Sequence, residues 1–142
     1  MRRLIILQVE DSYEEAVLLA RACQAAGLPA EFHEASSGAD AISYLLGEGA
    51  FADRTQHPLP DLIVLDLRMP GMNGIEFLQW ARRHPRFKEI PVLVFTVSRE
   101  PGDREIALEH GASGFYVKPF GFEALVRLAE SFAQFVSGPR AN

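Results

Sequence analysis

The fold is decided by Leu62-Ile63-Val64-Leu65-Asp66, four apolar residues in mid-chain that are followed at once by a carboxylate. A short apolar run without a polar face is typical of a strand buried on both sides, as in a parallel sheet covered by helices. The run is far shorter than the roughly 18 residues that a membrane-spanning helix needs. It therefore predicts an inner strand that ends in an acidic side chain.

Outward from this stretch, short apolar runs alternate with segments whose apolar residues recur at helical spacing. Glycine or proline closes most of these segments, which is typical of element boundaries. The predicted strands are Leu4–Val9, Ala30–Ala35, Leu62–Leu65, Val92–Phe95 and Gly114–Val117. The predicted helices are Glu14–Ala26, a helix capped by Ser36-Ser37 that carries Ile42, Leu45 and Leu46, Ile75–Arg83, about Asp103–His110, and Phe122–Val136.

Five strands alternating with five helices predict an α/β fold, with a doubly wound five-stranded parallel sheet. Right-handed crossovers leave few topologies, and we favour the flavodoxin-like strand order 2-1-3-4-5. The connection Gly47–Pro60 is longer than the roughly 2–6 residues usual in such folds. Loops of this length are often functional.

Composition limits the classes of function. A chain of 142 residues with 48% hydrophobic residues is expected to form one globular domain. Its net charge of −5 disfavours direct binding to nucleic acid. The lone cysteine, Cys23, fits a reducing compartment, and no apolar run is long enough for a membrane span, so we expect a cytoplasmic protein.

Polar side chains stand at the carboxyl ends of four predicted strands, where ligands bind in open parallel sheets. Singly, each has an ordinary explanation: Asp11 as a helix cap, Thr96 as a strand end, Lys118 as a solvated lysine. Their coincidence at one edge favours a functional site. The residues are Glu10-Asp11, Asp66, Thr96 with Ser98, and Lys118-Pro119.

The chemistry of this group predicts phosphoryl transfer. Three carboxylates at one edge repel each other unless a cation is shared, and Mg²⁺ accepts carboxylate ligands while leaving room for a phosphate oxygen. Asp66 is then a candidate nucleophile, since a carboxylate can form an aspartyl phosphate. Lys118 and the hydroxyl of Thr96 would stabilise the transferred group.

The sequence resembles the receiver domain of two-component response regulators over essentially its whole length. The matching blocks occur in the correct order, which makes the resemblance specific. They are Val9-Glu10-Asp11, Asp66-Leu67-Arg68-Met69-Pro70-Gly71-Met72-Asn73-Gly74, Pro91-Val92-Leu93-Val94-Phe95-Thr96 and Gly111-Ala112-Ser113-Gly114-Phe115-Tyr116-Val117-Lys118-Pro119-Phe120.

The resemblance implies that Asp66 accepts a phosphoryl group from the phosphohistidine of a sensor histidine kinase. It implies that Glu10 and Asp11 bind Mg²⁺ together with Asp66 and the backbone carbonyl of Arg68. Such a protein is a signalling phosphoprotein rather than an enzyme on other substrates, and catalyses only its own phosphorylation and slow dephosphorylation.

The same resemblance implies a switch pair, Thr96 and Phe115, and a cis peptide between Lys118 and Pro119. Two positions depart from the commonest family pattern. The residue after Thr96 is usually small, but here it is Val97, and the switch aromatic is Phe115 rather than tyrosine. We expect the branched Val97 to narrow access to the phosphoryl group.

A finer resemblance is to single-domain regulators paired with bacterial phytochrome kinases. It rests on the long Gly47–Pro60 connection, the Arg83–Pro91 segment and the aromatic final helix. We expect one receiver domain over residues 1–142, with a core of about residues 3–137 and no output domain. The signal would then pass through protein contacts.

Two alternatives use the same residues differently. A haloacid-dehalogenase phosphatase also has a strand-end aspartate, but needs a second aspartate two residues later as general acid, where this chain has Arg68. A guanidinium cannot donate its proton near neutral pH. A degenerate receiver that only binds proteins does not explain why every phosphotransfer residue is present.

The final predicted helix carries more apolar residues than packing on one sheet requires. At about 100° per residue they cover roughly 200° of its surface, about twice the usual stripe. We expect a homodimer through this surplus, with Val126, Ala133 and Phe135 at the interface. The alternative is that the C-terminal residues or the long loop cover this face.

Overall fold

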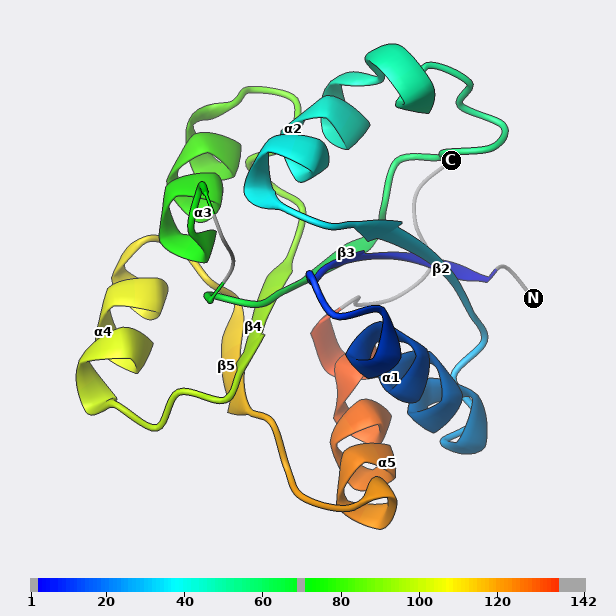
Figure 1. Cartoon of the computed structure of the whole chain (residues 1–142), viewed down its shortest axis with the longest axis vertical. Coiled ribbons are helices and arrows are strands. Elements are labelled where there is room, and N and C mark those ends of the chain that lie inside the picture. The colour runs from blue at the N-terminus through cyan, green and yellow to red at the C-terminus, as the bar shows by residue number, and fades with distance from the viewer. Residues whose placement is uncertain (1–2, 69–70, 136–142) are drawn as a thin grey trace.

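A five-stranded parallel sheet forms the centre of the molecule (Figure 1). The computed structural model describes residues 3–68 and 71–135, and its strands lie in the predicted order β2-β1-β3-β4-β5. The strands are β1 (Leu4–Val9), β2 (Ala30–Ala35), β3 (Leu62–Leu65), β4 (Val92–Thr96) and β5 (Gly114–Val117). The helices are α1 (Tyr13–Ala25), α2 (Gly38–Leu46), α3 (Gly74–Arg83), α4 (Pro101–Glu109) and α5 (Phe122–Glu130).

Helices cover the two faces of the sheet unequally (Figure 1). α1 and α5 pack on one face, where Ile6, Leu93 and Phe132 belong to one apolar cluster. α2, α3 and α4 cover the other, where Phe77 and Val94 belong to a second cluster. All residues of β3 and β4 are buried, as the apolar runs predicted. No helix within the described ranges has the length and hydrophobicity to cross a membrane.

Side-chain caps fix where the helices begin. The Ser12 hydroxyl accepts a hydrogen bond from the backbone N–H of Glu15, so α1 starts at Tyr13, one residue before the predicted boundary. Asn73 and Glu76 form a reciprocal capping box at the start of α3. These caps place the first turns of α1 and α3 next to the strand ends that precede them.

The final helix is shorter than the predicted Phe122–Val136. α5 ends at Glu130 and continues as a 3₁₀ helix, Ser131–Phe135, while Val136 lies outside the described residues. The hydroxyl of Ser131 donates to the carbonyl of Leu128, a local bond that competes with regular helix geometry. In this tighter turn Phe132 is buried in the apolar cluster on the α1–α5 face of the sheet.

The long connection between α2 and β3 is ordered around one arginine. It contains a 3₁₀ helix, Gly49–Phe51, followed by Arg54. The Arg54 guanidinium donates to the carbonyls of Tyr44 (2.8 Å), Leu45 (2.5 Å) and His57 (3.1 Å). Arg54 thereby supplies a donor to the Leu45 carbonyl at the end of α2 and joins the Gly47 N–H at the Tyr44 carbonyl.

Candidate functional site

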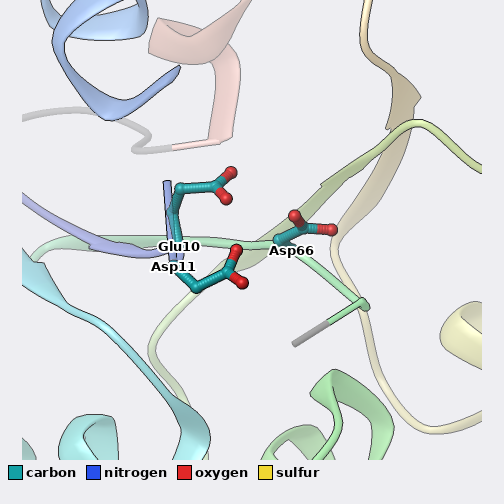
Figure 2. A group of neighbouring side chains, drawn as sticks. All are labelled: Glu10, Asp11 and Asp66. Atoms are coloured by element: carbon teal, nitrogen blue, oxygen red, sulfur yellow. The ribbon is translucent and has the colours of Figure 1, made fainter. Parts of the chain in front are cut away.

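Three carboxylates meet at the carboxyl edge of the sheet. Glu10 and Asp11 follow β1, and Asp66 follows β3 (Figure 2). β1 and β3 are parallel neighbours with Val9 opposite Leu65, so the residues after each strand emerge side by side. One oxygen from each carboxylate lies within 4.8 Å of the others. This is the juxtaposition that the strand-end pattern predicted.

The main chain holds Asp66 firmly in this position. Its backbone N–H donates to the Val9 carbonyl at 3.0 Å, and its Oδ1 accepts from the backbone N–H of Arg68 at 3.1 Å. Gly74 lies against the same loop, where a Cβ would come within 2.7 Å of the Asp66 carbonyl oxygen. Only glycine allows α3 to begin so close to the main chain of Asp66 and Leu67.

Lys118 joins the carboxylates from the far side of the sheet edge. It follows β5, and its Nζ donates to Glu10 Oε1 at 2.7 Å and to Asp66 Oδ2 at 3.2 Å. A third bond, of 2.6 Å, runs to Glu15 Oε1 on α1. The Nζ also lies 5.7 Å from the centroid of the Phe95 ring, a cation–π contact. The site therefore contains a cation bound by carboxylates from three parts of the chain.

Burial and charge act on these groups together. Burial raises the pKa of Glu10 to about 7; Lys118 opposes that shift, and the charge of Asp66 adds to it. Burial by itself would lower the pKa of Lys118, but the bonds to Glu10 and Glu15 and the charge of Asp66 raise that pKa above its ordinary range. Lys118 is therefore fully charged near neutral pH, and the pKa of Glu10 lies well above the ordinary range of a carboxyl group.

Thr96 ends β4, and its side chain is fully buried at the same edge. Its hydroxyl accepts from the backbone N–H of Ser98 at 3.3 Å. In the described part of the chain it makes no hydrogen bond to Asp66, so the two groups share an edge without direct contact. Ser98 in turn donates to Asp103 of α4, which also pairs with Arg68.

Comparison with known proteins identifies the family to which the chain belongs. The family described as "Response regulator receiver domain" matches residues 6–130. The chain belongs to this family. A curated relative, the probable methanogenesis regulatory protein FilR2 of Methanothrix harundinacea (strain 6Ac), is 34% identical over 135 residues, covering 94% of this chain and 84% of that protein. Other curated relatives are longer, and the chain covers 16% to 32% of their length.

Solved receiver structures extend the similarity. The phosphorylated cyanobacterial phytochrome response regulator RcpA matches with a TM-score of 0.84 and 27% identity, over 96% of both chains. The bacteriophytochrome response regulator AtBRR matches with a TM-score of 0.78 and 30% identity, over 100% of this chain and 98% of that one. The predicted likeness to phytochrome-associated single-domain regulators is thus confirmed, and the protein is a phosphoacceptor response regulator.

The sequence analysis did not identify two residues that take part in this site. Glu15 binds Lys118, and Asp103 connects Ser98 with Arg68. A signal existed for each. Glu15 stands four residues after Asp11, so the start of α1 turns it back toward the sheet edge. Asp103 lies in the first turn of α4, directly after the loop that carries Ser98.

The expected cis peptide between Lys118 and Pro119 was wrong, since every peptide bond of the described residues is trans. The trans form of a bond before proline is favoured by about 0.5–1 kcal/mol, and a cis bond persists only where a turn requires it. Here the chain turns into α5 at Gly121, whose φ of +87° only glycine adopts readily.

The three residues of the predicted dimer interface differ in their exposure to solvent. Val126 and Phe135 are half-buried and pack against the cluster beneath α1 and α5, and Phe135 also meets the Tyr116 ring edge-on. Ala133 is exposed. Because α5 packs on α1 as well as on the sheet, much of its wide apolar surface has a partner within the molecule.

Proposed function

We propose that Asp66 is the phosphoacceptor of this receiver. The observation that carries the proposal is the environment of its carboxylate. Oδ1 is held by the Arg68 N–H, Oδ2 faces the Lys118 ammonium, and the carboxylates of Glu10 and Asp11 lie beside it. With 7% of its surface exposed, Asp66 is nevertheless at the rim of the sheet, where a small phosphodonor can reach it.

In the proposed reaction, an oxygen of Asp66 attacks the phosphorus of the donor. The new O–P bond forms as the bond from phosphorus to the leaving group breaks, which is an N–P bond in phosphohistidine and an O–P bond in acetyl phosphate. Lys118 supplies positive charge to the oxygens of the transferred group. Hydrolysis of the acyl phosphate by water then returns the free carboxylate, slowly and without another protein.

The donor set fits a Mg²⁺ ion. Oxygen ligands from two or three carboxylates, close together at a solvent-accessible edge, suit a small hard cation that keeps part of its water shell. Glu10, Asp11 and Asp66 would hold the ion. The family resemblance adds the backbone carbonyl of Arg68 as a further ligand. When bound, Mg²⁺ neutralises charge on the phosphoryl oxygens and on the carboxylates.

The partner that supplies the phosphoryl group is proposed to be a sensor histidine kinase of the phytochrome class. The proposal is supported by the similarity to the phytochrome response regulators RcpA and AtBRR over nearly the full length of each chain. Incubation with a panel of phosphorylated sensor kinases, scored by initial transfer rate, tests it. Preferential transfer from a kinase of another class contradicts the pairing.

Thr96 and Phe115 are proposed to form the switch. Thr96 is buried beside the site, and Phe115, on the neighbouring strand β5, is half-buried against the α2–α4 side of the core. Movement of the Thr96 hydroxyl toward a phosphoryl oxygen would open space for the Phe115 ring, a shift between two populations. A structure with beryllofluoride should show Phe115 more buried; unchanged Thr96 and Phe115 conformers contradict the switch.

Self-association through α5 is a separate proposal, carried by the apolar side chains that remain accessible there. Phe122 is 45% exposed, and Ala133 is exposed on the following 3₁₀ helix. Sedimentation across micromolar concentrations, with Val126→Glu and Phe135→Glu, tests it. A monomer at every concentration contradicts the dimer. Unfolding of either variant would instead reflect the inward packing of these side chains.

The decisive experiment replaces the proposed acceptor. Asp66→Asn should abolish Mg²⁺-dependent labelling by acetyl phosphate, because an amide oxygen is a poor nucleophile toward phosphorus. Asp53→Asn makes the same chemical change at an exposed position on the α2–β3 connection and should label like the wild type. Stoichiometric label on the Asp66 variant would overturn the assignment.

A further inference from the structure

The ammonium of Lys118 has no hydrogen-bond donor left for a new ligand. A lysine side chain carries three N–H donors. The three acceptors around Nζ are Glu10 Oε1 at 2.7 Å, Glu15 Oε1 at 2.6 Å and Asp66 Oδ2 at 3.2 Å. An oxygen of an incoming phosphoryl group can therefore bind Lys118 only when one of these carboxylates gives up its bond.

The three carboxylates differ in their role and in their access to water. Glu10 and Asp66 belong to the acidic cluster, and only 9% of each side chain is exposed. Glu15 lies outside that cluster, on the first turn of α1, and 46% of its side chain is exposed. Glu15 can therefore return to water at a much smaller desolvation cost than the other two.

We propose that Glu15 is a releasable clamp on Lys118, which competes with the phosphoryl group for the ammonium and so sets how readily the receiver takes and holds phosphate. The inference rests on the proposed role of Asp66. In the resting protein Glu15 holds Lys118 with the shortest of the three bonds. On phosphorylation the Lys118 Nζ moves to a phosphoryl oxygen, and the Glu15 carboxylate swings out to solvent.

The geometry of α1 suits such a clamp. The backbone of Glu15 is fixed, because its N–H donates to the capping hydroxyl of Ser12. Its side chain is long and partly solvated, so release requires only a change of rotamer and no movement of the helix. Glu15 is thus a positioning residue, which acts on the transferred group only through Lys118.

The test compares two charge-neutralising variants of adjacent residues. Glu15→Gln removes the charge that binds Lys118, whereas Glu14→Gln removes the same charge from an exposed neighbour that Lys118 does not contact. The measured quantity is the affinity for beryllofluoride at saturating Mg²⁺, followed by fluorine NMR of the bound probe. Exposed ion pairs have modest energies, so Glu15→Gln should bind the probe roughly two- to fivefold more tightly than Glu14→Gln does.

Further measurements separate a clamp from a structural role. The thermal midpoint and the Mg²⁺ affinity of Glu15→Gln should equal those of Glu14→Gln, and Glu15→Asp should restore part of the wild-type probe affinity. A structure with beryllofluoride should show the Lys118 Nζ on a fluoride, with Glu15 no longer bonded to it. Equal probe affinity of the two glutamine variants, or a Glu15–Lys118 bond that persists in that complex, would overturn the clamp.

Failure of the proposed function gives a different result. If Asp66 is not the acceptor, Asp66→Asn still takes up label and binds the probe. If only the clamp is wrong, Asp66→Asn loses both while Glu15→Gln and Glu14→Gln stay alike.

Discussion

The molecule holds two partly buried cations in opposite ways. Lys118, at the carboxyl edge of the sheet, is bound by the carboxylates of Glu10, Glu15 and Asp66. Arg54, in the α2–β3 connection, is bound by the backbone carbonyls of Tyr44, Leu45 and His57. Both make three or more contacts of hydrogen-bond length, but the partners of Lys118 are charged side chains and those of Arg54 are neutral main chain.

This difference distinguishes the Lys118 site, whose bonding partners can change, from the Arg54 site, which only stabilises the loop conformation. Side-chain carboxylates can rotate away, take protons or turn to another cation, so Lys118 can change partners while the fold persists. The carbonyls around Arg54 belong to α2 and to the turn that ends at His57, so they cannot rotate away without movement of the main chain. Within the long connection, the contacts of Arg54 therefore serve to hold the main chain in place.

The largest effect on phosphorylation is expected from substitution of Lys118. Lys118→Ala should lower the rate of labelling by acetyl phosphate by about 10²-fold, since one charge that stabilises the transferred group is lost. Mg²⁺ affinity should change much less, because Lys118 is not a metal ligand. Calorimetric titration with Mg²⁺ beside the labelling assay measures both. An equal loss in the two assays would mean that Lys118 organises the carboxylates rather than the phosphoryl group.

Substitution of Arg54 should show the reverse pattern, a loss of stability without a loss of phosphorylation rate. Arg54→Ala removes the guanidinium that donates to the Leu45 carbonyl and the second donor to the Tyr44 carbonyl. It should lower the free energy of unfolding by about 2 kcal/mol, within the range for hydrogen bonds to a charged group. Urea denaturation measures this loss. The labelling rate at a temperature where the variant is folded should match the wild type. Arg54→Lys keeps the charge without the planar fork and should lie between the two. If folded Arg54→Ala were labelled by acetyl phosphate more slowly than the wild type, Arg54 would not be purely structural and its contrast with Lys118 would be wrong.

Cys23 offers an independent probe of the fold in both variants. Burial raises the pKa of its thiol from 9.0 to about 12, so the stability that comes from the neutral thiol is present below pH 9 and is lost as the pH rises toward 12. At pH 8 a thiol reagent should label the native protein only through unfolding. Labelling should therefore accelerate in Arg54→Ala, in step with its loss of unfolding free energy. In Lys118→Ala the same assay reports the stability that the bonds of Lys118 to Glu10, Glu15 and Asp66 contribute. Fast labelling of the native wild type at pH 8 would show that Cys23 is accessible without unfolding.

The smallest effect concerns access to the phosphoryl group at the rim. Val97 follows Thr96 and is 61% exposed, so its branched side chain stands in solvent beside the site. Val97→Ala should speed the loss of phosphate from the labelled protein, by a smaller factor than Lys118→Ala changes labelling. Decay of the aspartyl phosphate after removal of acetyl phosphate measures it. An unchanged or slower decay would show that Val97 does not obstruct the attacking water.

Local patterns were sufficient to predict the sheet and the central carboxylates. The run Leu62–Leu65 is short and uninterrupted, which is typical of an inner strand, and a carboxylate directly after such a strand lies at the ligand-binding edge of a parallel sheet. Element boundaries were less accurate. β4 includes Thr96, because Thr96 pairs with Val117 of β5. α5 gives way to a 3₁₀ helix at Ser131, where the serine hydroxyl bonds to the Leu128 carbonyl.

The sequence by itself limited the strand order to a few topologies, of which the favoured one is observed, and it predicted that Glu10, Asp11 and Asp66 meet at one edge of the sheet. It could do so because hydrophobic period and chain connectivity are properties of neighbours along the chain. Only the tertiary structure decided that Glu15 binds Lys118, that Asp103 joins Ser98 to Arg68, and that Val126 and Phe135 face inward. These contacts connect residues on different elements. Their formation depends on how far each helix is displaced and rotated against the sheet, and no local pattern of residues specifies that displacement.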